Sequence, residues 1–362
     1  MAKSMNGLSR DLIIHPGETL QEVLEDRKMT QKELAGRTGV TEKHVSKIVN
    51  GKGNISSSFA KKLEYALGIK ASFWMKLQSN YDQELLEFEE FNNVSKDEIS
   101  ILKKLKEFIE YAKKINILRD VVDNASMVLE LRNVLAVSNL LSIPKIPYNG
   151  AYRAQTSNTV DVYVLFAWQK LCEIITRDII VAEKMNIECL KTSINEIKSL
   201  IGKDPAVIDS ELRRIFAKCG IAFSVVRHFK GAPVHGFIKY NEDEKLILCM
   251  TIRKSFADIF WFTLFHEIGH ILNGDVKDRF IDFESVHNEK EDKADDFSKN
   301  TLINHVDFKE FCECGNFSLD AIKEFSEIQG VMPYIIIGRL QKEEYIPWSQ
   351  YVCEKTRFKW VS

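Results

Sequence analysis

The sequence lacks the features that mark secreted, disulfide-rich or membrane-spanning proteins. Its seven cysteines are scattered, odd in number and never spaced as C-x-x-C, which argues against a disulfide framework and against a four-cysteine zinc site. Residues 1–11 contain no apolar core of the kind that a secretory signal needs, and no run reaches the length that spans a membrane. There is also no sequence repeat and no low-complexity tract. We therefore expect a cytoplasmic protein with reduced, buried thiols and no membrane partner.

The composition is that of a soluble globular protein. Hydrophobic residues make up 45% and charged residues 28% of the 362 residues, a length that allows two or three domains. The net charge of −2 is unevenly distributed, because residues 1–80 contain 13 lysines and arginines against 8 aspartates and glutamates. The excess of basic residues in residues 1–80 is small. A basic N-terminal part followed by an acidic remainder indicates an anionic partner for the N-terminal part.

The N-terminal part predicts a series of short helices. Pro16 suits a helix start, the segment Thr30-Gln31-Lys32-Glu33 is a capping box, and Gly39 is placed to end the helix that this box opens. Thr41 can cap the next helix. Two short helices joined by a glycine-containing turn predict a helix-turn-helix, although an ordinary helical bundle has the same pattern. The five expected helices cover about residues 17–27, 30–38, 41–50, 57–67 and 72–81.

A helix-turn-helix would place specific side chains against double-stranded DNA. The second helix of the pair enters the major groove with its N-terminal residues facing the bases. Gln31 and Lys32, at the start of the preceding helix, would meet phosphate, because helix N-termini favour anions. The candidate base-facing residues are Thr41, Lys43, His44, Ser46 and Lys47.

Residues 83–204 predict helices but carry no chemical motif. A capping box at Ser95 opens a long helix to about Asn116, and further helices are expected over about residues 160–184 and 189–201. After residue 205 the pattern changes to short runs rich in Val, Ile and Phe. They predict a small antiparallel sheet with strands at 222–229, 234–240 and 245–249, the last being an edge strand that could pair with a peptide. The expected class is α+β, mostly α.

The sharpest motif is His266-Glu267-Ile268-Gly269-His270, in a strongly apolar predicted helix. Histidines four residues apart lie one turn apart on one face, so both can reach one Zn²⁺. Glu267 lies about 100° further round the helix and is placed to take a proton from a zinc-bound water. The alternative is a pair of core histidines with a surface glutamate, which leaves a charge on an apolar helix.

A catalytic zinc needs a third protein ligand, and the acidic run at 289–297 offers one. Glu291 and Asp295 are four residues apart, so one carboxylate can bind the metal while Asp295 accepts an N–H from a ligating histidine. A solvated helix face would have the same charges. Glu289 is the alternative ligand, whereas His287 and His305 lack supporting spacing.

The C-terminal motifs resemble those of the ImmA/IrrE metallopeptidases, which are similar to gluzincins. The resemblance rests on His266–His270 followed by Glu291-x-x-Ala294-Asp295-x-Phe297, and it extends over about residues 205–350. It implies that Glu291 is the third zinc ligand and that the protein hydrolyses peptide bonds. Two positions depart from that family's pattern, Lys293 in place of a second glutamate and Asn304 in place of a proline, and neither removes a ligand.

The N-terminal motifs resemble those of HigA-type antitoxins, helix-turn-helix repressors of the XRE group. The motifs are His15–Leu20, Thr30–Ala35, Ile48–Lys52 and Leu67-Gly68-Ile69-x-x-Ser72-Phe73-Trp74. This resemblance implies a lambda-repressor-like domain that binds palindromic operator DNA as a homodimer and neutralises a HigB-like toxin.

Together the two resemblances predict three regions. Residues 1–82 are a HigA-like DNA-binding domain, residues 83–204 a helical connector and residues 205–362 an ImmA/IrrE-like zinc peptidase domain. The predicted function is a DNA-binding regulator of the toxin–antitoxin kind, whose zinc endopeptidase cleaves a repressor or antitoxin, or the protein itself. Two alternatives stay open: a HigA-like repressor with a non-cleaving sensor or toxin-binding body, and a metalloprotein with another hydrolysable substrate.

Overall fold

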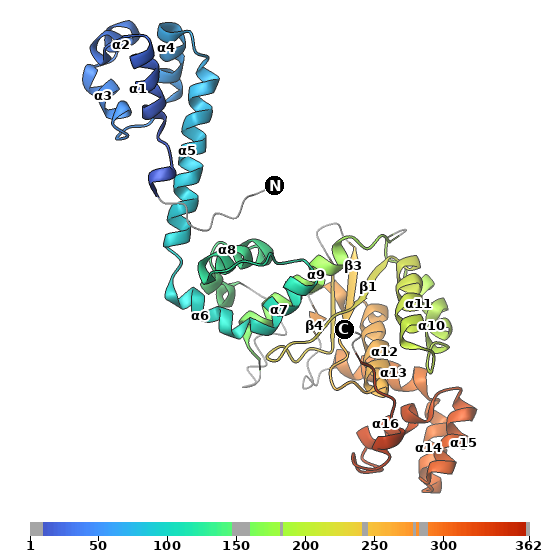
Figure 1. Cartoon of the computed structure of the whole chain (residues 1–362). Coiled ribbons are helices and arrows are strands. Elements are labelled where there is room, and N and C mark those ends of the chain that lie inside the picture. Colours follow the sequence, from blue (N-terminus) through green and yellow to red (C-terminus); the bar gives the residue numbers. More distant parts are fainter. Residues whose placement is uncertain are drawn as a thin grey trace. The chain divides into compact units, whose positions relative to one another are not determined.

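The computed structural model describes residues 10–146, 160–181, 184–240, 245–277, 280–281 and 289–359 (Figure 1). The chain divides into two compact units. The first comprises Met1–Ile99 and Arg119–Glu130, and the second comprises Ser100–Leu118 and Leu131–Ser362. The described residues are mostly helical with one small sheet, which confirms the predicted α+β class. The three predicted regions, with boundaries at residues 82 and 204, stay a prediction.

The first unit begins with the five predicted helices. Thr30, Thr41 and Ser56 each cap a helix by accepting the backbone N–H three residues ahead, and Gly39 ends its helix in the left-handed conformation. The fifth helix also includes residues 82–92, the acidic and polar stretch expected to be a helical extension or a connector, because no helix breaker interrupts it. The elements are η1 (Arg10–Leu12), α1 (Pro16–Asp26), α2 (Gln31–Thr38), α3 (Glu42–Val49), α4 (Ser57–Leu67) and α5 (Ala71–Asn92).

One close backbone contact fixes α1 against α3. A Cβ at Gly17 would lie 1.9 Å from the carbonyl oxygen of Ile48, so only glycine fits at this crossing. Behind it, fully buried apolar side chains join the helices into one core. They include Leu20, Leu34, Val45, Ile48, Phe59, Leu63 and Trp74.

The remaining helices precede or follow the strands in the chain. The long helix predicted from Ser95 is two helices that meet at Leu105, and the helix predicted over residues 160–184 is shorter. The elements are α6 (Lys96–Lys104), α7 (Lys106–Lys114), α8 (Asn124–Leu135), η2 (Leu140–Lys145), α9 (Val162–Arg177), α10 (Ile187–Lys198), α11 (Pro205–Lys218), α12 (Ala257–Asn273), η4 (Asp275–Lys277), α13 (Glu289–Leu302), α14 (His305–Cys314), α15 (Leu319–Gln329), α16 (Pro333–Lys342) and η5 (Val352–Glu354).

The sheet is mixed, so the prediction of an antiparallel sheet was wrong. Its strand order is β1-β3-β2-β4, with β1 (Ile221–Val225) parallel to β3 (Leu246–Met250) and β2 (Gly236–Tyr240) antiparallel both to β3 and to β4 (Phe280–Ile281). The predicted edge strand at 245–249 is therefore central. Its sequence is continuously apolar and every residue of β3 is buried, which is the pattern of a strand with neighbours on both sides.

Helices α9 and α12 cover opposite faces of this sheet. In β2, the ring of Phe237 packs on Trp168 of α9, whereas Gly236 lies against Glu267 of α12. Successive strand residues face opposite sides, so the two helices sandwich the sheet. The motif helix α12 is thereby held between the sheet and α13 (Figure 1).

One described stretch meets the length and hydropathy limits of a membrane span, against the expectation that no run would. It is Asn124–Lys145, with a mean hydropathy of 1.2 and 33% of its window buried. A single stretch of this kind is weak evidence of a membrane-spanning helix. The stretch is also not one continuous α-helix, because α8 ends inside it before η2 begins.

Candidate metal centre and nucleic-acid interface

Helix α12 brings His266 and His270 together. The two residues are one turn apart on the helix, and both are buried. Their Nε2 atoms lie 3.0 Å apart, and the rings meet edge to face with centroids 4.6 Å apart. Both Nε2 atoms therefore point to one place beside the helix.

Helix α13 supplies a carboxylate to the same place. The Oε2 atom of Glu291 lies 3.2 Å from the Nε2 of His266 and 3.6 Å from the Nε2 of His270. Four ligands at about 2.0–2.1 Å around a tetrahedral zinc are about 3.3 Å from one another, so these separations fit one ion. Within the described residues, these three side chains are the one group able to hold a metal, with ligand atoms all within 4.8 Å.

Small residues let α13 approach α12 closely enough for this geometry. A Cβ at Gly269 would lie 3.1 Å from the Cα of Ala294, closer than side chains ordinarily pack. Gly269 stands between the histidines in sequence, and Ala294 lies one turn after Glu291. The contact between Gly269 and Ala294 therefore sets the distance between the Glu291 carboxylate and the two histidines.

Each histidine also has a carboxylate at its other ring nitrogen. The Nδ1 of His266 lies 2.8 Å from Oδ1 of Asp295, and the Nδ1 of His270 lies 3.5 Å from Oδ2 of Asp275. Such partners fix the tautomer in which the lone pair of Nε2 can bind a metal. Asp275 was missed. The sequence feature that could have identified Asp275 is its position directly after Gly274. The left-handed conformation of Gly274 ends α12 and turns the chain back toward His270.

The electrostatics keep Glu291 and Asp295 ionised. Burial raises the pKa of Glu291, but hydrogen bonds to His266 and His270 and the charges of these rings outweigh it and hold the pKa at about 2. Burial likewise raises the pKa of Asp295, and its hydrogen bond with His266 more than reverses the effect. A metal ligand must be deprotonated, so Glu291 is in the required state at neutral pH.

Glu267 lies against the backbone of β2. Its side chain is fully buried, and a Cβ at Gly236 would be 1.8 Å from its Oε1 atom. The glycine therefore makes room for this carboxylate. Glu267 is adjacent to His266 on α12, so its carboxylate lies toward the sheet, whereas the paired imidazoles face Glu291 and Asp295 of α13.

The alternative ligands do not reach the cluster. Glu289 is exposed and pairs with Lys293 at 2.7 Å, and His305 is exposed at the start of α14. His287 lies outside the described residues. Of the acidic residues proposed as a third ligand, the structure brings Glu291 to the histidines.

The predicted DNA-contacting side chains lie on α2 and α3. Lys32, Lys43, His44 and Lys47 are exposed, and Gln31 and Ser46 are half-buried. Thr41 is exposed but its hydroxyl accepts the backbone N–H of His44 at 3.2 Å, so it caps α3. DNA contact by these seven residues stays a prediction.

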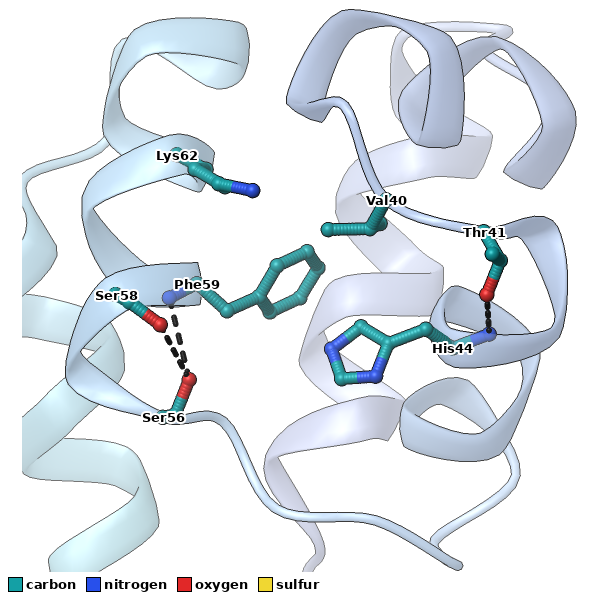
Figure 2. Close-up of a pocket in the computed structure, with 7 residues that line it drawn as sticks. All are labelled: Val40, Thr41, His44, Ser56, Ser58, Phe59 and Lys62. Carbon is teal, nitrogen blue, oxygen red and sulfur yellow. Dashed lines mark hydrogen bonds between the residues drawn. The ribbon is translucent and has the colours of Figure 1, made fainter.

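A pocket extends this surface from α3 to α4 (Figure 2). The ring of Phe59 lies at 5.0 Å and edge to face with the ring of His44, which gives the pocket an apolar wall. The hydroxyl of Ser56 lies 3.1 Å from that of Ser58, and the ammonium of Lys62 extends toward the opening. Ser56, Ser58 and Lys62 were absent from the predicted interface. The lining residues are Val40, Thr41, His44, Ser56, Ser58, Phe59 and Lys62.

Comparison with known proteins assigns this region. The helix-turn-helix family model matches residues 20–74, from within α1 to the start of α5. Residues 20–74 are a helix-turn-helix domain of the XRE type. No curated protein matches the chain.

Solved structures similar to the chain include antitoxins. An antidote protein of a HigA family from Coxiella burnetii is 30% identical, over 27% of this chain and 91% of that one, with a TM-score of 0.19. A Pseudomonas aeruginosa protein in complex with its operator DNA is 37% identical, over 19% and 76%, with a TM-score of 0.19. The Pseudomonas aeruginosa antitoxin HigA with the higBA promoter is 28% identical, over 27% and 91%, also with a TM-score of 0.19. At such TM-scores the assignment of the helix-turn-helix domain rests on the family model and the sequence.

Proposed function

We propose that this protein is a cytoplasmic, antitoxin-like transcriptional regulator that binds operator DNA through its helix-turn-helix domain and hydrolyses peptide bonds at a zinc site. The observation that carries the enzymatic half is the convergence of His266, His270 and Glu291 on one point, together with the buried carboxylate of Glu267, the residue next to His266 on α12. A purely structural ion would not need that carboxylate.

The DNA-binding half is supported by the family match and by the chemistry of the surface. Three lysines and a histidine stand exposed on α2 and α3, and α4 adds Lys62 at the rim of the pocket. Side chains from α3 would read bases, whereas Lys62 and Ser58 would meet a backbone phosphate next to them. Similar proteins have been crystallised with operator or promoter DNA.

In the hydrolytic half, the chain's own residues would hold the ion and move the proton. Zinc bound by the three side chains would supply Lewis-acid chemistry that polarises a peptide carbonyl. Asp295 and Asp275 orient the imidazoles. Glu267 would take a proton from the attacking water and deliver it to the leaving amine. The proposed substrate is a repressor or antitoxin-type protein, or the chain itself.

Metal analysis and one conservative substitution test the enzymatic half. The purified protein should contain about one zinc per chain. His266→Ala should lose it, while Glu267→Gln should keep it and stop cleavage of the chain or of a co-expressed repressor. A wild-type protein without zinc, or a Glu267→Gln variant that still cleaves, would contradict the proposal.

The DNA-binding half has an independent test. The protein should shift a fragment of its own promoter with an affinity that falls steeply with salt, because phosphate contacts release counterions. Lys43→Ala/Lys47→Ala should abolish the shift, and Lys62→Ala should weaken binding to all fragments and reduce the salt slope by about 1. Lys309, an exposed lysine of α14, offers a matched control as Lys309→Ala. Equal loss in that control would contradict the assigned interface.

The family match covers the helix-turn-helix domain, and this favours a second function in which the protein represses without cleaving. The C-terminal unit would then bind a HigB-like toxin or a ligand. Retention of derepression by Glu267→Gln would favour it. Homodimer formation on a palindromic operator is expected under both functions.

A further inference from the structure

Two cysteines outside the metal centre lie in direct contact. Cys189 is in the first turn of α10, where its backbone N–H is held by the side chain of Asn186 at 2.9 Å. Cys219 is the residue that ends α11. Their Sγ atoms are 2.8 Å apart although 30 positions separate them in the sequence. The two sulfurs would have to approach by about 0.8 Å to reach the length of a disulfide bond.

The backbone on both sides holds the two thiols in place. The N–H of Asn186 donates to the carbonyl of Cys219 at 2.9 Å. The next residue, Gly220, has φ +79° and would place a Cβ 2.6 Å from the backbone of Lys184, so only glycine fits there. The two segments therefore touch at backbone level, and the thiol contact is a property of the fold more than of two flexible side chains.

We propose that Cys189 and Cys219 form a reversible disulfide by exchange with a small-molecule disulfide such as glutathione disulfide. Cys189 loses its proton and its thiolate attacks the reagent. The departing thiolate takes up that proton and leaves as one thiol, and a mixed disulfide remains on Cys189. Cys219 then loses its proton, attacks the Cys189 sulfur and releases the second thiol. Two protein thiols are oxidised, one small disulfide is reduced to two thiols, and the Cys219 proton goes to the departing thiolate.

The different exposure of the two cysteines, and the raised pKa of Cys219, set the order of these steps. Cys189 is half-buried and within reach of a reagent, whereas Cys219 is fully buried. Burial, together with the neighbouring Cys189 thiol, raises the pKa of Cys219 to about 12, so Cys189 is the thiol that reacts first. The hydroxyl of Ser193 donates to the carbonyl of Cys189 at 2.8 Å, and its oxygen lies 3.7 Å from the Cys219 sulfur.

The disulfide would join α10 to α11, which packs on β1. Helix α10 also meets α13, where Lys198 donates to the carbonyl of Thr301 at 3.0 Å. Closing the 30-residue loop restricts the unfolded chain, so oxidation should raise the melting temperature of the second unit by roughly 5–10 °C.

The experiment treats the full-length, reduced protein with glutathione disulfide and maps its peptides without reduction. We expect one cross-linked pair holding Cys189 and Cys219, the loss of two titratable thiols, the rise in melting temperature, and full reversal by dithiothreitol. Cys189→Ser should lose all of these, whereas Cys353→Ser, which removes an exposed cysteine, should keep them.

The peptide map of the unaltered protein shows whether Cys189 and Cys219 form a disulfide, even where a variant fails to fold. A glutathione adduct that persists on Cys189, with Cys219 still alkylated after denaturation, would overturn the proposal. Cross-links between two chains, or a Cys353→Ser protein that no longer forms the intramolecular pair, would overturn it as well. Zinc content and promoter binding are measured separately, so a failed disulfide test leaves the proposed function standing.

Discussion

Single residues decide where the Glu267 carboxylate lies, and Gly236 is the clearest of them. Gly236→Ala would place a methyl group 1.8 Å from Oε1, so the carboxylate must move. We expect peptide hydrolysis to fall about a hundredfold or more, the zinc content to stay near one per chain, and the protein to lose about 1–3 kcal/mol of stability in urea unfolding.

The matched control for Gly236→Ala is Gly36→Ala. Gly36 lies on the exposed side of α2, and an added Cβ there meets nothing within 4 Å. This variant should keep hydrolysis and gain about 0.5–1 kcal/mol, the usual preference of a helix for alanine. An equal loss of hydrolysis in both variants would show that Gly236 has no particular place beside Glu267.

His15 gives the first unit a pH dependence. Its Nδ1 accepts the N–H of Gly17 at 2.9 Å at the start of α1, which requires the neutral ring. Burial lowers the pKa of His15 below its usual 6.5, against the raising effect of Glu18 and Asp82. Because the unfolded chain then binds the proton more tightly, the stability of this unit is full above about pH 6.5 and declines as the pH falls toward the lowered pKa.

Hydrogen–deuterium exchange of peptides from α1 to α4, corrected for the intrinsic effect of pH, measures this decline. In His15→Asn the amide oxygen can still cap α1 but does not titrate between pH 5 and 7, so the slope should vanish. His44→Asn, at an exposed histidine of the same unit, should retain the slope. A slope that survives in His15→Asn would assign it to another group.

At the scale of elements, the pairing of α12 with α13 sets the metal geometry. Gly269→Val would add branched bulk where a single Cβ is already 3.1 Å from Ala294, so α13 must move away and take Glu291 with it. We expect zinc affinity to fall at least tenfold, by roughly 1.4 kcal/mol or more, as measured by competition with a chromophoric chelator. Gly36→Val, on an open helix surface, measures the cost of valine in a helix alone, and zinc binding in that protein should be unchanged.

The same scale shows what the sequence could predict. Most helices of the first unit and the caps at Thr30 and Thr41 follow from residues within a few positions of one another, so they were predicted well. Strand pairing depends on distant segments, so the parallel pairing of β1 with β3 and the short β4 were missed. Asp275 was missed for a related reason, because only the turn after α12 reveals that its carboxylate faces His270.

At the scale of the whole molecule, the two units have separate hydrophobic cores and separate candidate functions. We expect zinc to stabilise the second unit alone, by about 2.7 kcal/mol at a hundredfold excess over its dissociation constant. Differential scanning calorimetry of the full chain should therefore show one transition that moves with a chelator and one that does not. In Glu291→Ala neither transition should move when the chelator is added. If the chelator lowered the affinity of the unaltered protein for its promoter, the two units would be coupled.

The turn at Gly274 limits how the chain can vary in length. A left-handed residue ends α12, and the very next side chain returns to the histidine five positions earlier. One residue inserted between His270 and Asp275 would rotate that carboxylate out of reach, whereas insertions beyond η4 would leave it where it is. Related sequences that keep this site should therefore preserve the five-residue interval between His270 and Asp275, and should vary in length only beyond η4.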